Sequence, residues 1–196
     1  MVTEIRIYYE GDRLLRPGFD AFFVTLRERA KEKRCGFRLI AAKGNPDRDF
    51  QTAIKTHPNA WNVLLKDSEG PAAGDLSSSL CEQNQWSQSH AKSIFWMVEM
   101  MESWFHADKD ALGRFYGPGP KFRRSALKAN PNVEQISKKD LKDGLSAATK
   151  DTSKGDYYDH KTSHGPKLLA SINPELVKEA APHCKKLFQA VLTELA

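Results

Sequence analysis

The stretch that decides the fold is Ala60-Trp61-Asn62-Val63-Leu64-Leu65-Lys66-Asp67-Ser68-Glu69-Gly70-Pro71. Within it, a short apolar run ends abruptly in two carboxylates one residue apart, and Gly-Pro follows. A run of this length and composition predicts a buried strand. Open α/β sheets bind their ligands beyond the carboxyl ends of their strands, so Asp67 and Glu69 stand where such a fold would place a site.

A second strand-like run, Ile5-Arg6-Ile7-Tyr8-Tyr9-Glu10-Gly11, also ends in an acid followed by glycine. On an extended strand Asp67 and Glu69 would share a face, and Glu10 would join them at the same sheet edge. Mg²⁺ takes oxygen ligands, and two or three carboxylates are a usual protein contribution. These acids therefore predict a site for Mg²⁺ or Mn²⁺. The alternative stays open that they are ordinary strand-end acids, with Glu10 in a turn or at a helix cap.

The first half of the chain alternates strand and helix patterns. Strands are predicted at residues 3–10, 37–43, 60–65 and 94–98, and helices at 17–34, 47–55 and 100–115, with a loop at 70–79. The opening β-α-β-α-β order predicts an α/β fold in which helices flank a mostly parallel sheet with right-handed crossovers.

A break at Gly117-Pro118-Gly119-Pro120 predicts the end of this α/β core. We therefore expect two parts, a core at residues 1–117 and a helical, basic C-terminal extension at 118–196 that packs on the core. In the extension, Ser137 is placed to cap a helix, and residues 150–166 are expected to be irregular. Asn173-Pro174 predicts the start of a final helix, which Pro182 interrupts or restarts.

Composition indicates a cytoplasmic protein without a membrane segment. The mean hydropathy is −0.59, and the longest apolar stretch, at residues 94–101, is far too short to span a bilayer. No apolar signal core follows the N-terminus, so secretion is not expected. The three cysteines are widely spaced without a Cys-x-x-Cys pair, which fits a reducing cytoplasm and supports neither a disulfide framework nor a zinc finger.

The positive charge is concentrated in one segment. Residues 121–167 hold eleven Lys and Arg against six Asp and Glu, which accounts for the whole net charge of +5. A basic segment near an acidic metal site suits a nucleic acid held beside that site. The alternative is a solvated surface loop, since modest charge excesses are common.

Several motifs resemble one family. Tyr9-Glu10-Gly11 and Asp67-Ser68-Glu69-Gly70-Pro71 look like the two acidic motifs of Toprim domains, which occur in primases, topoisomerases and overcoming-lysogenization-defect nucleases. Residues 65–71, 101–108 and 158–166 are similar to runs in a Toprim-like bacterial family of unknown function, encoded beside ABC-type ATPases in anti-phage defence loci. The resemblance covers the chain from Ile5 to the final helix. One departure is Glu69, where Toprim domains usually carry aspartate.

The resemblance implies roles for particular side chains. Glu10, Asp67 and Glu69 would hold the metal, with Glu10 also available as a general acid or base, and Glu102, Lys161 and His164 join Glu10 as catalytic candidates. Lys161 and His164 would contact phosphate. The alternative is that they lie in an exposed loop without a functional role. A zinc pair of His160 and His164 is not supported, because Gly155, Gly165 and Pro166 argue against a helix there. For Glu102 a structural role is an equal alternative, and Asp108 fits a helix cap better than a site.

The leading hypothesis is a Mg²⁺-dependent nuclease, or nuclease subunit, that acts on nucleic acid, with DNA expected, together with an ABC-type ATPase in anti-phage defence. Two alternatives remain: a non-catalytic subunit that docks on the ATPase and regulates it, and a basic nucleic-acid-binding protein without catalysis. The chain has neither a Gly-x-Ser-x-Gly elbow nor a Walker phosphate loop, so serine hydrolysis and ATP binding by that route are not expected.

Overall fold

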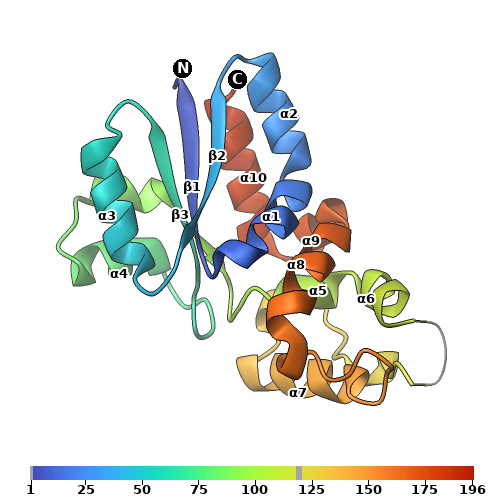
Figure 1. Ribbon diagram of the computed structural model, residues 1–196. Coiled ribbons are helices and arrows are strands. Elements are labelled where there is room, and N and C mark those ends of the chain that lie inside the picture. Colours follow the sequence, from blue (N-terminus) through green and yellow to red (C-terminus); the bar gives the residue numbers. More distant parts are fainter. Residues whose placement is uncertain (1, 118–120) are drawn as a thin grey trace.

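The computed structural model describes residues 2–117 and 121–196, so the predicted break at Pro118-Gly119-Pro120 lies outside the described residues. Four parallel strands form one sheet in the order β2-β1-β3-β4 (Figure 1). Their bounds are β1 (Glu4–Glu10), β2 (Gly36–Ala42), β3 (Trp61–Asp67) and β4 (Ile94–Met97). The predicted α/β fold with a parallel sheet flanked by helices is therefore confirmed.

Helices cover both faces of the sheet (Figure 1). Ile5, Ile7 and Tyr9 alternate along β1 and bury against one helical layer, while Tyr8 joins a separate cluster with Ala42 and Ala53 on the other face. The first layer contains α1 (Arg16–Phe22), α2 (Val24–Glu32) and α10 (Pro182–Glu194), and the second contains α3 (Pro46–Thr56) and α4 (Leu76–Gln83). Burial on both faces explains the nearly continuous apolar run of β3.

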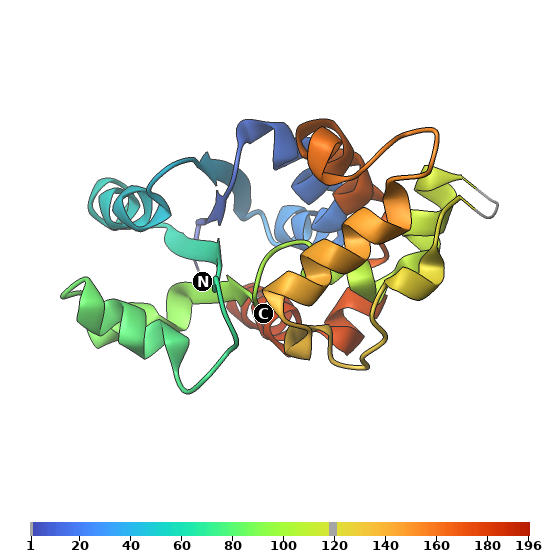
Figure 2. The same cartoon turned by 90° about the horizontal axis from the view of Figure 1, so that it is seen from below.

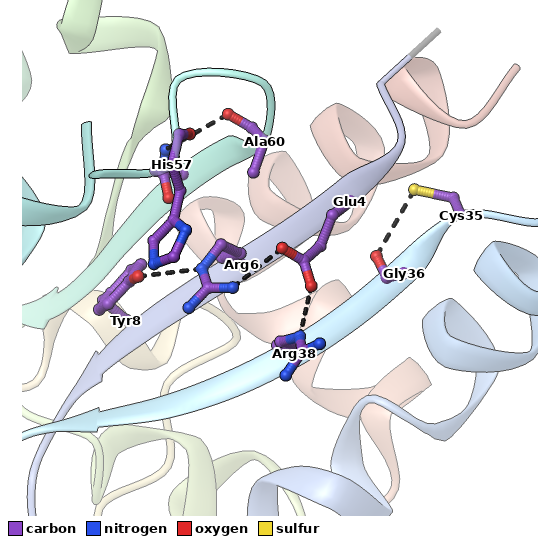
Figure 3. A network of polar contacts seen from close by, with 9 residues as sticks. Glu4, Arg6, Tyr8, Cys35, Gly36, Arg38, His57 and Ala60 are labelled. Atoms are coloured by element: carbon purple, nitrogen blue, oxygen red, sulfur yellow. Dashed lines mark hydrogen bonds and ion pairs between the residues drawn. The ribbon is translucent and has the colours of Figure 1, made fainter. Parts of the chain in front are cut away.

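The amino end of the sheet is held by a polar network on the α3 side (Figure 3). Arg6 donates to Glu4 Oε2 at 2.9 Å and to the Tyr8 hydroxyl at 3.0 Å, and Arg38 on β2 pairs with the other oxygen of Glu4. Because Arg6 and Arg38 lie opposite each other in the β1–β2 register, the network links the two strands. Both guanidiniums pair with the single carboxylate of Glu4, so the network is a structural feature that joins the two strands.

Two helices expected to be continuous are each split in two. The helix predicted at 17–34 follows a short 3-10 turn (Arg13–Leu15) and turns at Phe23, between α1 and α2. Phe22 and Phe23 are adjacent, yet both are buried against Phe188, with ring centroids at 5.8 and 5.6 Å. Burial of both side chains agrees with the apolar face that the helical spacing of Phe19, Phe22 and Phe23 predicts, although the helix itself is divided.

The helix predicted at 100–115 consists of α5 (Ser103–Ala107) and α6 (Lys109–Tyr116). Asp108 separates them, and its carboxylate accepts from Ala111 N at 3.0 Å and from Asn173 N at 2.9 Å. The prediction that Asp108 acts as a helix cap is thus correct. By contrast, the loop expected at 70–79 contains the start of α4, where Asp75 accepts from Ser77 N and Ser78 N. Asp75 with Ser77 and Ser78 after it is a helix-cap signal, but the Gly-, Ala-, Ser- and Pro-rich composition of the segment favoured a loop.

The C-terminal part is helical, as predicted. Its short 3-10 turns lie at Arg124–Ala126, Val133–Gln135 and Tyr158–His160, and its helices are α7 (Lys138–Thr149), α8 (Lys161–Ser171), α9 (Pro174–Ala180) and α10. A further 3-10 turn, Gln88–Ser93, precedes β4. Ser137 caps α7 and Asn173 caps α9, as expected, and Pro182 restarts the chain as α10.

The expectation of an irregular segment at 150–166 is wrong from Lys161 onward, because α8 begins there and contains Pro166. Helix α8 packs on α1 so closely that a Cβ at Gly18 would lie 2.7 Å from the Pro166 carbonyl oxygen. An internal proline costs a helix about 3 kcal/mol. The expectation from Gly165 and Pro166 included this local cost but no contact with another helix. Packing of α8 against α1 supplies the stabilisation that offsets the cost of the proline.

One buried cluster extends from Ile5 to Leu195 and includes Leu112, Leu145 and Leu168 on both sides of residue 117. The division at 117 stays a prediction, since both parts contribute to a single core. Figure 2 views the molecule from below and shows α3 and α4 on one side, with α7 and α8 on the other. Within residues 2–117 and 121–196, no helix has the length and apolar character needed to cross a membrane.

Candidate functional site

The acids expected at the sheet edge do converge there in part. Because β1 and β3 are adjacent and parallel, with Tyr9 opposite Leu65, their carboxyl ends finish side by side. The Asp67 backbone N–H donates to Glu10 Oε2 at 3.0 Å, so the last residue of β3 is linked to the last residue of β1. The sequence prediction that two distant strand ends meet is supported by this contact.

Asp67 is in an environment that disfavours its charge. Burial raises the pKa of this carboxyl well above its ordinary value, and the nearby carboxylates of Glu102 and Glu10 raise it further. A hydrogen bond from Met101 N to Oδ1, at 2.8 Å, and the charge of Lys161 act in the opposite direction. Among the described residues, Glu102 alone of these three acids makes an ion pair, with Lys161, so the negative charges of the cluster outnumber the positive charge paired with them.

Glu102 is the most deeply buried acid of the cluster, with no exposed surface. Its Oε1 accepts from the Tyr157 hydroxyl at 2.8 Å and from Lys161 Nζ at 2.7 Å. Its Oε2 is buried and has no hydrogen-bond partner among the described residues. An unpartnered carboxylate oxygen in the interior is costly, so its retention points to a role for this atom.

Glu69 does not share a face with Asp67, contrary to expectation. Strand β3 ends at Asp67, and Glu69 adopts a left-handed backbone conformation with φ +60°. Its side chain is largely exposed and pairs with Lys138 at the first position of α7. The strand-based expectation failed because the chain turns immediately after Asp67, where strand alternation no longer applies.

Glu99 occupies a similar position after β4. It has φ +62° and a buried carboxylate that accepts from Lys138 N at 3.0 Å, while its own N–H donates to Ser68 Oγ at 2.8 Å. Left-handed backbone in non-glycine residues is strained and tends to gather at functional sites. The loops after β3 and β4 are therefore tied to each other and to α7 beside the acid cluster.

The two candidates on α8 differ in their surroundings. Lys161 is about half exposed and reaches Glu102. His164 is buried, its Nδ1 lies 3.0 Å from the Tyr116 hydroxyl, and its ring packs against Phe115. Burial and the charges of neighbouring His160, Lys167 and Lys154 lower the pKa of His164, which favours the neutral form of its ring.

Reasoning from the sequence missed Tyr157 and Glu99. Tyr157 immediately precedes the Tyr158-Asp159-His160-Lys161 run, but a single tyrosine in a polar segment carries no signal of its own. Glu99 interrupts an apolar run, which was visible, yet its contacts depend on a turn after β4 that no local pattern indicates.

The donor set fits a hard divalent cation. Glu10, Asp67 and Glu102 offer carboxylate oxygens, their charges are under-compensated, and Glu102 Oε2 has no partner in the described part of the chain. Across residues 2–117 and 121–196, however, no three His, Cys, Asp or Glu side chains are already arranged as a complete metal site. Binding would therefore require side-chain adjustment, for which a cation supplies the driving force by neutralising the cluster.

Comparison with known proteins places the chain beside one family and one solved structure. A family model described as Domain of unknown function (DUF4276) matches residues 11–192. The C-terminal region of the Burkholderia pseudomallei OLD protein is similar in structure, with a TM-score of 0.57 over 100% of both chains and 14% sequence identity. At this identity the likeness concerns the fold. No match was found among curated proteins.

Proposed function

Since this chain belongs to the family described as Domain of unknown function (DUF4276), and shares its fold with the C-terminal region of an OLD protein, we propose that it is a Mg²⁺- or Mn²⁺-dependent nuclease or nuclease subunit. The substrate is a phosphodiester of nucleic acid, DNA in the first instance. The observation that carries this proposal is the cluster in which Glu10 and Asp67, half-buried at the carboxyl ends of β1 and β3, lie near the fully buried Glu102 with one lysine paired to the three acids.

In this proposal, Glu10, Asp67 and Glu102 hold the cation, and Glu69 joins them when it leaves Lys138. A divalent ion bound there activates water and stabilises the charge that develops on a phosphodiester. Glu10 is also available as a general acid or base. Lys161, half exposed beside Glu102, is the group best placed to contact substrate phosphate.

His164 has a narrower role in the proposal. Its ring is buried and hydrogen-bonded to Tyr116, which supports a function in holding α8, and with it Lys161, against α6. Direct contact between His164 and phosphate stays a prediction of the sequence. The basic residues between 121 and 167 supply the positive surface for a polyanion. An ABC-type ATPase partner, action in anti-phage defence and a cytoplasmic location belong to the same proposal and rest on the family resemblance.

The direct test is cleavage of plasmid and single-stranded DNA with Mg²⁺ or Mn²⁺, alone and with an ABC-type ATPase of the kind proposed as its partner. We expect Asp67→Ala and Glu102→Gln to lower the cleavage rate by about 100-fold or more, as loss of a transition-state contact does. Glu28→Gln on exposed α2 is the matched control and should leave the rate unchanged. Cleavage that survives Asp67→Ala at the wild-type rate would refute the assignment.

A second candidate function is a non-catalytic subunit that docks on an ATPase and regulates it. The pairing of Glu69 with Lys138 favours this candidate, because one expected metal ligand is already engaged in an ion pair. Isothermal titration with Mg²⁺ and Mn²⁺ separates the two. Absence of binding at millimolar concentration, together with a stable complex with the ATPase, would support the regulatory subunit.

A further inference from the structure

We infer that Tyr157 is a positioning residue of the proposed metal site, whose hydroxyl holds Glu102 in the orientation that leaves Oε2 available to a divalent cation. The inference rests on the proposed function for the identity of the ligand. Beyond that function, it assigns to Tyr157 the orientation of Glu102, the most deeply buried carboxylate of the site.

Tyr157 is itself held rigidly. The residue has no exposed surface, and its backbone N–H donates to Thr149 Oγ1 at 2.9 Å. The ring packs edge-to-face against Phe105 at 5.9 Å and Tyr158 at 5.0 Å between centroids. Contacts on both sides of the ring fix the direction in which the hydroxyl points.

The hydrogen bonds to Glu102 are divided unevenly between its oxygens. Tyr157 and Lys161 both donate to Oε1, at 2.8 and 2.7 Å, while Oε2 has no partner among the described residues. A carboxylate can only accept, so the Tyr157 hydroxyl is the donor in this hydrogen bond. Both donors therefore bind the same oxygen of Glu102. The other oxygen, Oε2, is left without a partner in the described part of the chain, where it can serve a cation.

Lys161 alone would not select this orientation. Its side chain is about half exposed and flexible, and it can follow either oxygen of Glu102. Tyr157 cannot follow, because its ring is locked and because α8 covers its hydroxyl: a Cβ at Gly165 would lie 3.3 Å from that oxygen. The tyrosine is thus the fixed donor, and the lysine the adjustable one.

The test compares Tyr157→Phe with Tyr158→Phe. Both keep the ring, but the Tyr158 hydroxyl is buried without a partner in the described ranges, so its removal breaks no hydrogen bond. We expect Mn²⁺ binding, measured by electron paramagnetic resonance, to weaken about 10-fold in Tyr157→Phe, the size expected for loss of a ligand-orienting contact. The line shape of bound Mn²⁺ should change in this variant, and Tyr158→Phe should match the wild type in both respects.

A double-mutant cycle with Glu102→Gln excludes a general effect on folding. If Tyr157 acts through Glu102, Tyr157→Phe adds no further loss of Mn²⁺ affinity in the Glu102→Gln background. Equal losses in both backgrounds, or Mn²⁺ binding by Tyr157→Phe equal to the wild type, would overturn the inference while the proposed function stands. Failure of the wild-type protein to bind Mn²⁺ at all would overturn the proposed function and this inference together.

Discussion

Hydrogen bonds hold Asp67 in place, yet its surroundings disfavour the negative charge of its carboxyl group. It ends β3, where its backbone N–H and its Oδ1 both make short hydrogen bonds that close the loop around the sheet edge. Its burial beside Glu102 and Glu10 nevertheless makes its ionised form unfavourable. Charge that destabilises the fold in the absence of a ligand is a usual feature of binding sites.

This conflict predicts that Asp67→Asn stabilises the metal-free protein. The folded-state pKa of Asp67 is raised, so the carboxyl contributes stability when protonated and loses it as pH rises through that pKa. At pH 8 the variant should unfold with a free energy about 1 kcal/mol higher than the wild type, a typical gain from relieving a functional site. Thermal unfolding with and without Mn²⁺ checks this, and only the wild type should be stabilised by the ion. A less stable variant in the absence of metal would contradict the prediction.

His106 predicts an acid-dependent loss of stability at another place. It is buried on α5, and neither ring nitrogen has a hydrogen-bond partner among the described residues. Burial, together with the charge of Lys109, lowers its pKa to about 4. A histidine with a depressed folded-state pKa contributes stability above its unfolded pKa of about 6.5 and loses it as pH falls toward the folded value.

For His106→Leu we therefore expect a smaller loss of stability between pH 7 and pH 4. The shift corresponds to at most about 3 kcal/mol in the wild type. Leucine has no group to protonate and fills a similar buried volume. Urea unfolding at both pH values measures the difference. An identical pH dependence in the two proteins would show that His106 is not responsible.

At the level of elements, the contact between α1 and α8 positions the basic side of the site. Helix α8 carries Lys161 at its first position, and its internal Pro166 lies against Gly18. Glycine is needed at 18 because a Cβ there would also lie 2.9 Å from the Leu169 Cβ. Close approach of the two backbones thus places Lys161 beside Glu102.

This contact predicts that Gly18→Ala destabilises the protein, although alanine is the better helix former. Overpacking against backbone typically costs about 1–3 kcal/mol, which exceeds the gain in helix propensity of about 1 kcal/mol. Gly113→Ala on α6 is the matched control, because its Cβ would lie 3.6 Å from the Phe122 ring, an ordinary contact. Chemical denaturation should show a loss for Gly18→Ala and no loss for Gly113→Ala. Equal effects would mean that α8 can move away from α1 at no cost.

Over the whole molecule, the C-terminal part completes both the core and the site. The main buried cluster joins residues of β1, α1, α7, α8 and α10, and the group around Glu102 needs Tyr157 and Lys161 from the same part. Figure 1 shows the strands ending toward these helices. A sheet with one face uncovered would expose the apolar side chains of β1 to water.

We therefore expect a fragment of residues 1–117 not to fold by itself. Removal of α10 takes away part of the helical layer over Ile5, Ile7 and Tyr9, and removal of α8 takes away the helix that packs on α1. Circular dichroism during heating should show no cooperative transition for the fragment, in contrast to the full chain. Cooperative unfolding of the fragment would instead establish residues 1–117 as an independent domain.

The fold class and half of the site could be derived from local patterns. Strand spacing, the caps at Ser137 and Asn173, and the acids Glu10 and Asp67 were all visible, because periodicity, capping and strand ends are properties of short stretches. The convergence of Glu10 and Asp67 followed from one additional rule, that adjacent parallel strands end at the same edge.

The sequence by itself determined that acids would gather at one edge of a parallel sheet. The succession of strands and helices along the chain and their hydrophobic patterns are properties of short stretches. Only the tertiary structure decided which acids remain there: it directs Glu69 to Lys138, buries Glu102 and supplies Tyr157. It also made a helix of the segment around Pro166. The physical reason is that these outcomes depend on burial and on partners far away in the chain, whose energies exceed the local preferences of the residues concerned.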